Sequence, residues 1–137
     1  MNRRFPHNVM AEAQASIDAT TQIRVHLPVP PRQLSPNARC HFMAKAKITK
    51  QARATAAAMA LSALGTRPLW KRATVKAVWH FPDARRRDHD NLMASCKAYF
   101  DGLRDAGIIE DDSGLTHEPP EIVKGERGLT LIVTKVG

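Results

Sequence analysis

The sequence predicts an α/β fold of the α+β type, in which two helices pack on a mixed β-sheet within a single domain. Two observations support this fold class. Segments with the alternating apolar pattern of strands and segments with helical periodicity follow one another in the order β-α-β-α-β-β. The chain has 137 residues, enough for one hydrophobic core. We place the domain at residues 23–137 and interpret residues 1–22 as an N-terminal tail or arm.

The first half of the domain contains a strand and a long helix. Ile23, Val25 and Leu27 alternate with basic residues, which is the pattern of a half-buried strand, and Pro28 ends it. Residues 42–64 are rich in alanine and other helix formers. The apolar stripe that we expect this helix to bury comprises Ile48, Ala52, Ala56, Met59 and Ala63.

The second half contains the clearest strand, residues 73–81, with Val75, Ala77, Trp79 and Phe81 on one face. Residues 91–106 predict a second helix. Its apolar side comprises Leu92, Cys96, Tyr99, Phe100 and Leu103. Residues 121–125 and 129–136 predict two strands joined by a turn, and therefore a β-hairpin.

The charge balance favours a polyanionic partner. The chain has 21 Lys and Arg against 13 Asp and Glu, a net charge of +8. No apolar run approaches the ~18 residues of a membrane span, so we expect no membrane partner. Cys40 and Cys96 lack metal-binding spacing and are interpreted as reduced thiols, which predicts a cytoplasmic protein.

Lysines crowd the first half of the predicted helix over residues 42–64. Lys45, Lys47, Lys50 and Arg53 either form a solvated face or contact phosphates. Cations near a helix N-terminus oppose the helix dipole. This unfavourable placement points to the phosphate-contacting alternative.

Residues 85–114 combine arginines with acidic residues at both ends of the second predicted helix. Asp88 and Asp90 precede this helix, and Asp111 and Asp112 follow it. At 100° per residue, Asp90 and Lys97 share a helix face. Phosphodiester hydrolysis needs a nucleophilic water and neutralised phosphate charge, which Mg²⁺ held by carboxylates supplies. The sequence therefore predicts a Mg²⁺ site here, flanked by phosphate-binding arginines.

A structural interpretation of the same aspartates stays open. Asp88 or Asp90 could cap the helix, because a carboxylate accepts hydrogen bonds from free backbone N–H groups. Asp111, Asp112, Ser113 and Gly114 have the composition of a turn. Spacing alone does not separate these roles from metal binding.

Several motifs closely resemble the core of the RusA-type Holliday junction resolvases, the crossover junction endodeoxyribonucleases encoded by prophages and phages. They are RRRDHDNL at 85–92, KAYFD at 97–101, DAG at 105–107 and DD at 111–112. Upstream, LPVPP at 27–31 and SPN at 35–37 resemble that family's opening strand and loop. The resemblance extends over about residues 23–136.

The resemblance implies a RusA-like fold and a homodimer that binds four-way DNA junctions in recombination and repair. It also implies paired nicks in opposing strands, 5′-phosphate products, Mg²⁺ as cofactor with Mn²⁺ as a substitute, and no small-molecule cofactor. The catalytic residues that it implies are Asp88, Asp90, Asp112 and Lys97, with Asp111 as a further metal ligand. The expected DNA-binding residues are Arg85, Arg86, Arg87, Asn37, Arg39, Lys45, Lys47 and Lys50. Relative to the founding member, three additional residues precede Lys97, which moves it by nearly one helical turn.

Other functions remain open. The chain could be a flap or fork endonuclease with the same chemistry, or a non-catalytic protein that binds DNA junctions. A basic RNA-binding module would fit the charge but gives no reason for four aspartates around one helix.

Overall fold

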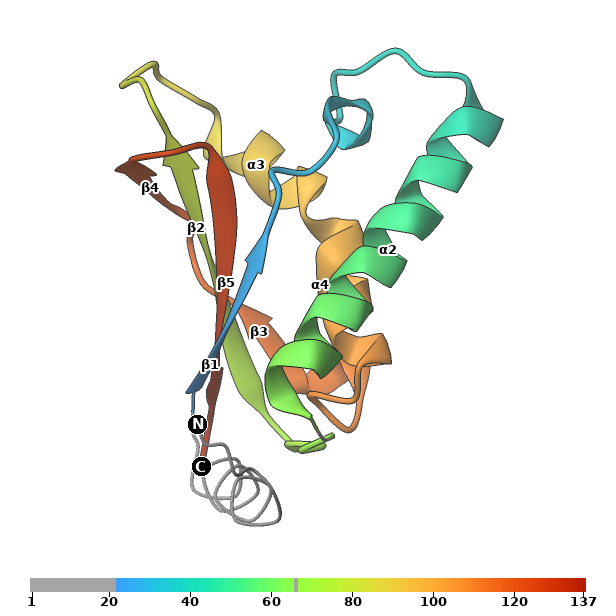
Figure 1. Ribbon diagram of the computed structural model, residues 1–137, viewed down its shortest axis with the longest axis vertical. Helices are drawn as coiled ribbons and strands as arrows, with labels where there is room; N and C mark the ends of the chain where they lie inside the picture. Colours follow the sequence, from blue (N-terminus) through green and yellow to red (C-terminus); the bar gives the residue numbers. More distant parts are fainter. Residues whose placement is uncertain (1–21, 66) are drawn as a thin grey trace, which may run out of the picture.

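The computed structural model describes residues 22–65 and 67–137, which form a single compact domain (Figure 1). The predicted tail at residues 1–22 lies outside the described residues except for Gln22, which begins the first strand. No helix in the described part is both long enough and apolar enough to cross a membrane.

A five-stranded mixed sheet forms one layer of the domain. It comprises β1 (Gln22–Leu27), β2 (Ala73–Phe81), β3 (Leu115–His117), β4 (Glu121–Lys124) and β5 (Gly128–Lys135). β5 lies between β1 and β2 and is antiparallel to both. On its other side, β2 pairs in parallel with β3 near its beginning and with β4 near its end. β2 therefore has hydrogen-bonded neighbours on both sides.

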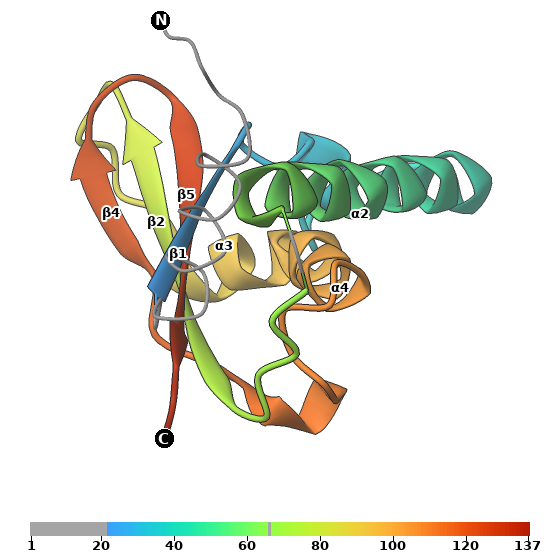
Figure 2. The ribbon, with the colours of Figure 1, turned by 60° about the horizontal axis from the view of Figure 1, so that its bottom comes forward.

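The helices lie together on one face of this sheet (Figures 1 and 2). They are α2 (Phe42–Leu64), α3 (His89–Ser95) and α4 (Lys97–Asp105), with short 3-10 turns η1 (Arg32–Leu34) and η2 (Asp112–Gly114). This mixed sheet with helices packed on it confirms the predicted fold class.

The core forms between the sheet and the helices. The predicted inner face of β2 is confirmed: Val75, Ala77, Trp79 and Phe81 are all buried. On β5, Leu129 pairs with Trp79 and Leu131 with Ala77, and both leucines are buried as well. The helices contribute the buried side chains that the second-helix pattern predicted, Cys96, Tyr99, Phe100 and Leu103, while Leu92 is partly buried.

The buried stripe of α2 differs in part from the prediction. Ala52 and Ala56 are buried as expected, but the stripe continues through Ala60 and Leu64, and Met59 and Ala63 are exposed. Three small residues four positions apart make this stripe shallow, so α4 can pack close to it. Gly102 of α4 lies at this contact, where an added Cβ would overlap the Arg53 carbonyl oxygen and lie 2.7 Å from Ala56 Cβ.

The second helix is not continuous as predicted. It breaks at Cys96, where the backbone takes φ −87° and ψ −4°. The Cys96 N–H donates to the Met93 carbonyl, an i→i−3 bond that tightens the end of α3, and the Ser95 hydroxyl donates to the Asn91 carbonyl. The predicted helix is therefore two shorter helices, α3 and α4.

The predicted hairpin of the last two strands is wrong. β4 and β5 lie on opposite sides of β2 instead of pairing with each other. The connection crosses the end of β2, where the Gly125 N–H donates to the Phe81 carbonyl at 2.9 Å. Burial of Ile122 against the core fixes β4 on the far side of β2, which is a tertiary effect that the local turn pattern does not contain.

We predict that Gly102→Ala destabilises the domain by about 1–3 kcal/mol, although alanine favours helices, because a methyl group overfills the α2–α4 contact. Urea denaturation monitored by circular dichroism measures the change. Gly125→Ala is the matched control, because a Cβ there meets its nearest atom only at 4.0 Å. Equal stability of the Gly102 variant and the wild type would contradict this close helix contact.

We also predict that the two thiols differ in reactivity. Burial raises the pKa of Cys96 to about 12, whereas Cys40 is only half-buried. The thiolate is the reactive form, so native protein at pH 8 should lose one thiol to iodoacetamide and denatured protein two. Cys40→Ser should abolish the native reaction. Rapid native labelling of the Cys40→Ser variant would show that Cys96 is not packed as described.

Candidate functional site

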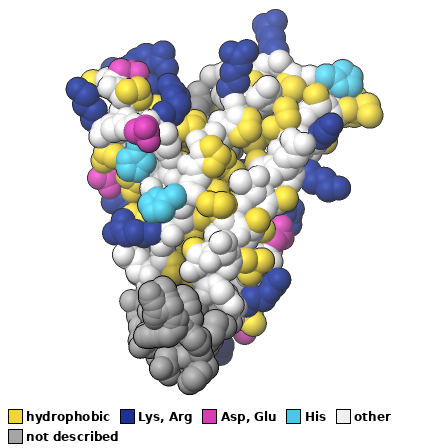
Figure 3. Space-filling model, in the orientation of Figure 1, with side chains coloured by type: hydrophobic (Ala, Val, Ile, Leu, Met, Phe, Trp, Pro, Cys, Tyr) yellow, Lys and Arg dark blue, Asp and Glu magenta, His cyan; other side chains and the backbone are white. Residues whose placement is uncertain are grey.

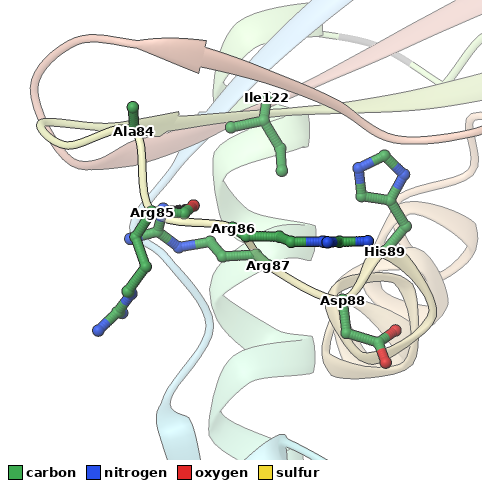
Figure 4. Close-up of a pocket in the computed structure, with 7 residues that line it drawn as sticks. All are labelled: Ala84, Arg85, Arg86, Arg87, Asp88, His89 and Ile122. Atoms are coloured by element: carbon green, nitrogen blue, oxygen red, sulfur yellow. Dashed lines mark hydrogen bonds between the residues drawn. The ribbon is translucent and has the colours of Figure 1, made fainter.

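An arginine-lined cavity opens where the chain leaves the end of β2 and enters α3. Its volume is about 810 Å³. It is lined by Ala84, Arg85, Arg86, Arg87, Asp88, His89 and Ile122 (Figure 4). The cavity thus contains the beginning of the Asp-x-Asp motif together with all three predicted arginines.

Asp88 caps α3, so the capping interpretation is correct for this residue. One carboxylate oxygen, Oδ1, accepts the backbone N–H of Asp90 at 2.9 Å and of Asn91 at 3.2 Å. Oδ2 has no hydrogen-bond partner among the described residues, and the Asp88 side chain is exposed. Asp90 lies exposed in the first turn of α3. Capping therefore leaves one oxygen of Asp88 and the carboxylate of Asp90 facing solvent.

The three arginines differ in their surroundings. The side chain of Arg87 is only 9% exposed, and its guanidinium lies 3.6 Å from the centre of the Phe81 ring. It also donates to the Arg85 carbonyl at 2.9 Å and pairs with Asp83 at 3.2 Å. The Arg85 backbone N–H and the nearby Arg87 charge lower the pKa of Asp83. Arg87 therefore holds the loop in shape, while Arg85 and Arg86 are exposed and available to a ligand.

Lys97 lies away from this cavity. Its ammonium pairs with Asp101 at 3.1 Å, and Asp101 also accepts from Arg104. Lys97 instead lines a separate cavity of about 300 Å³, together with Ala94 of α3 and with Lys45 and Thr49 of α2. The predicted catalytic lysine is therefore ion-paired and lines a different cavity from Asp88.

Asp111 and Asp112 belong to the opposite end of the sheet. Just before them, the Glu110 N–H donates to the Trp70 carbonyl at 2.8 Å, and just after them Gly114 packs on the backbone of Lys71. Both partners precede β2, whereas the arginine-lined cavity follows it. The nine residues of β2 span about 30 Å at about 3.3 Å each. Within one chain, the backbone of these two aspartates is therefore separated from Asp88 and Asp90 by most of the strand (Figure 1).

The turn interpretation of the same segment is also correct. The Gly114 N–H donates to the Asp111 carbonyl at 2.9 Å, and residues 112–114 form η2. The side chain of Asp112 lies outside the described part, so its predicted role as a ligand stays a prediction.

Asp88 and Asp90 provide part of the ligand set that a Mg²⁺ ion requires. The described residues contain no group of three or more His, Cys, Asp or Glu side chains arranged to hold a metal. Mg²⁺ usually binds through one or two carboxylates and completes its shell with water and substrate phosphates. Asp88 Oδ2 and the Asp90 carboxylate match this donor set, whereas Asp111 of the same chain does not join them.

The other predicted DNA-binding residues lie around the N-terminal part of α2. Asn37 and Arg39 line a cavity of about 680 Å³ in the loop before α2, and Lys45, Lys47 and Lys50 follow on the helix. Residues 32–64 contain six Lys and Arg and no Asp or Glu. Arg53 pairs with Asp105. The other five make no ion pair within residues 22–65 and 67–137.

Two residues that line the cavity, His89 and Ile122, were not among the predicted site residues. Phe81 was predicted only as a core residue, and its ring also contacts the Arg87 guanidinium. His89 lies between the two aspartates and could have been included from position alone. Ile122 could not, because only the parallel pairing of β4 with β2 brings it there.

No family model matches the chain. An "Uncharacterized protein" of Xylella fastidiosa (strain Temecula1 / ATCC 700964) is 37% identical over 94 residues, which are 66% of this chain and 61% of that protein. The chain thus spans less than two thirds of this relative. The structure of the thiamine-monophosphate kinase of Stenotrophomonas maltophilia K279a aligns with 87% of this chain and 33% of the kinase chain. The sequence identity is 15% and the TM-score is 0.28.

Proposed function

We propose that this protein is a Mg²⁺-dependent endodeoxyribonuclease that resolves four-way DNA junctions as a homodimer. The observation that carries the proposal is the position of Asp88 and Asp90. Both carboxylates are exposed at the beginning of α3, and Asp88 lines the cavity together with the exposed Arg85 and Arg86. The resemblance of residues 85–112 to the RusA-type resolvases and the net charge of +8 support the same assignment.

Each of these residues has its own role in the proposal. Asp88 and Asp90 would hold Mg²⁺, which, when bound, neutralises phosphate charge and activates water. Arg85 and Arg86 bind the phosphates that flank the scissile bond. Arg87 keeps the loop in the shape that presents its neighbours. Lys97 adds positive charge from the α4 side, and its ammonium has to leave Asp101 to reach a phosphate.

The separation of the two aspartate pairs gives the dimer a further role in this proposal. Asp111 and Asp112 lie at the far end of β2, so they join Asp88 and Asp90 only if a second copy presents them. Two-fold symmetry would then build two equivalent sites, one for each of the paired nicks.

We predict that Asp88→Asn and Asp90→Asn each lower cleavage of a labelled four-way junction by at least about a hundredfold in Mg²⁺. Asparagine at position 88 still caps α3, so the melting temperature should stay close to that of the wild type. Junction binding in EDTA should also be retained. Glu126→Gln is the matched control, because Glu126 is an exposed carboxylate that makes no ion pair within the described residues and does not line the cavity. Cleavage at the wild-type rate by the Asp90 variant would remove the assignment.

We further predict that Asp90→Asn and Asp112→Asn complement each other when the two inactive proteins are unfolded together and refolded. In a shared site, each mixed dimer has one site with both native aspartates, so single nicks should reappear. If each chain builds its own site, every site in the mixed dimer carries one substitution, and no cleavage returns. The second result would show that the two pairs of aspartates do not combine between chains.

A non-catalytic DNA-junction-binding protein is the second candidate. The pairing of Lys97 with Asp101 favours it, because the ion pair neutralises the charge that a catalytic lysine would bring to a phosphate. Tight junction binding without nicking in either Mg²⁺ or Mn²⁺ would support this alternative. The third candidate is a flap or fork endonuclease with the same chemistry. A panel of junction, fork and flap substrates tests it, since equal cleavage of all three would indicate a general branched-DNA endonuclease.

A further inference from the structure

We propose that the free end of α2 is a DNA-stacking tip, formed by Phe42 and Met43, that inserts beside an unstacked base at the branch point. The proposal rests on DNA as the partner under the proposed function. It adds a contact to the bases, whereas the residues discussed above contact phosphates.

The tip projects beyond the packed body of the protein. Phe42 is 76% exposed and Met43 is 65% exposed, the two highest values among the exposed large hydrophobic side chains of the described part. Ile48, the seventh residue of α2, is the first that packs against the core, and Ala52 is the first that is buried. The six residues before Ile48 span about 9 Å of helix. Figure 2 shows α2 extending past the other elements at this end.

The aromatic ring of Phe42 is held in place although it is exposed. The His41 ring stacks on it with 4.9 Å between ring centres and 25° between planes. His41 in turn caps α2, because its Nδ1 accepts the backbone N–H of Met43 at 3.2 Å. The cap and the stack together offer a partner a flat aromatic surface whose position is already fixed.

The charge around the tip selects a nucleic acid as its occupant. Arg39, Lys45, Lys47 and Lys50 all lie within eight residues of Phe42 in the chain, and residues 32–64 contain no acidic residue. Figure 3 shows hydrophobic, His and Lys or Arg side chains together over the free end of α2, without Asp or Glu among them. Bases stack on aromatic side chains while adjacent cations bind the phosphates. Apolar side chains can also wedge between base steps.

A branch point suits this tip better than continuous duplex, because bases there are already partly unstacked. The free end of α2 lies at the same end of the molecule as the loop over residues 82–88 (Figure 1). One DNA arm could therefore meet the tip while another enters the arginine-lined cavity.

The first test is a pair of binding titrations with a four-way junction in EDTA, where no cleavage occurs. Phe42→Ala should weaken binding about tenfold without changing the slope of log K against log salt, because stacking releases no counterions. Lys47→Gln should reduce that slope by about one. Met59→Ala, which removes an exposed side chain farther along the same helix, should change neither the affinity nor the slope.

The second test places a reporter at the tip. Phe42→Trp should bind the junction like the wild type, and its added fluorescence should be quenched by the DNA, whereas Met59→Trp should not be quenched. Unchanged affinity of Phe42→Ala, or no quenching in Phe42→Trp, would overturn the tip while leaving the nuclease proposal intact. If the junction quenches Phe42→Trp but the wild type cleaves no junction, the nuclease proposal is overturned and the DNA-stacking tip is supported.

Two further outcomes assign the tip to another partner and overturn the proposal. One is quenching of Phe42→Trp by phosphatidylserine vesicles but not by the junction. The other is a dimer in sedimentation velocity that Phe42→Ala dissociates, which would make the tip a contact between copies of this chain. Absence of junction binding by the wild type would overturn both the tip and the proposed function.

Discussion

Burial of strand β2 is the constraint on which the rest of the structure depends. The strand is hydrogen-bonded on both sides, and its inner face packs under the helices through Val75, Ala77, Trp79 and Phe81. A strand satisfied on both edges cannot slip in register without moving its whole apolar face to solvent. β2 is therefore fixed in the sheet, and its two ends position different candidate segments. The arginine-lined cavity lies at one end, and the turn with Asp111 lies at the other.

Basic and acidic residues are distributed unevenly along the chain. Residues 22–82 contain eleven Lys and Arg and no Asp or Glu, so every acidic residue of the described part follows Phe81. Some of these charges pair between the halves, as in Arg53 with Asp105 and Lys76 with Glu121. Arg32 and Arg39 before α2, and Lys45, Lys47 and Lys50 in its N-terminal half, make no ion pair within the described residues. Exposed pairs of this kind contribute little to stability, so this excess of positive charge has more effect on what the protein binds than on how it folds.

Asp88 combines an observed structural role with the proposed role as a metal ligand. One oxygen accepts hydrogen bonds from two backbone N–H groups at the beginning of α3, and the other has no hydrogen-bond partner among the described residues. Capping also fixes the carboxylate, which a metal ligand requires. Arg87 is the opposite case, since its contacts with Phe81, Asp83 and Arg85 leave it mainly structural.

The sequence by itself determined the strands, the helical segments, the buried face of β2 and the candidate residues, because these follow from local periodicity and side-chain chemistry. Only the tertiary structure decided which candidates meet. Hydrogen bonding of Glu110 to Trp70 and packing of Gly114 on Lys71 held the acidic turn at the beginning of β2, and the crossing of β4 to the far side of β2 replaced the expected hairpin. Both depend on packing between segments distant in the chain, which local patterns do not record. The length of β2 had the largest effect, because it separates Asp88 and Asp90 from the acidic turn that the sequence places only about twenty residues later.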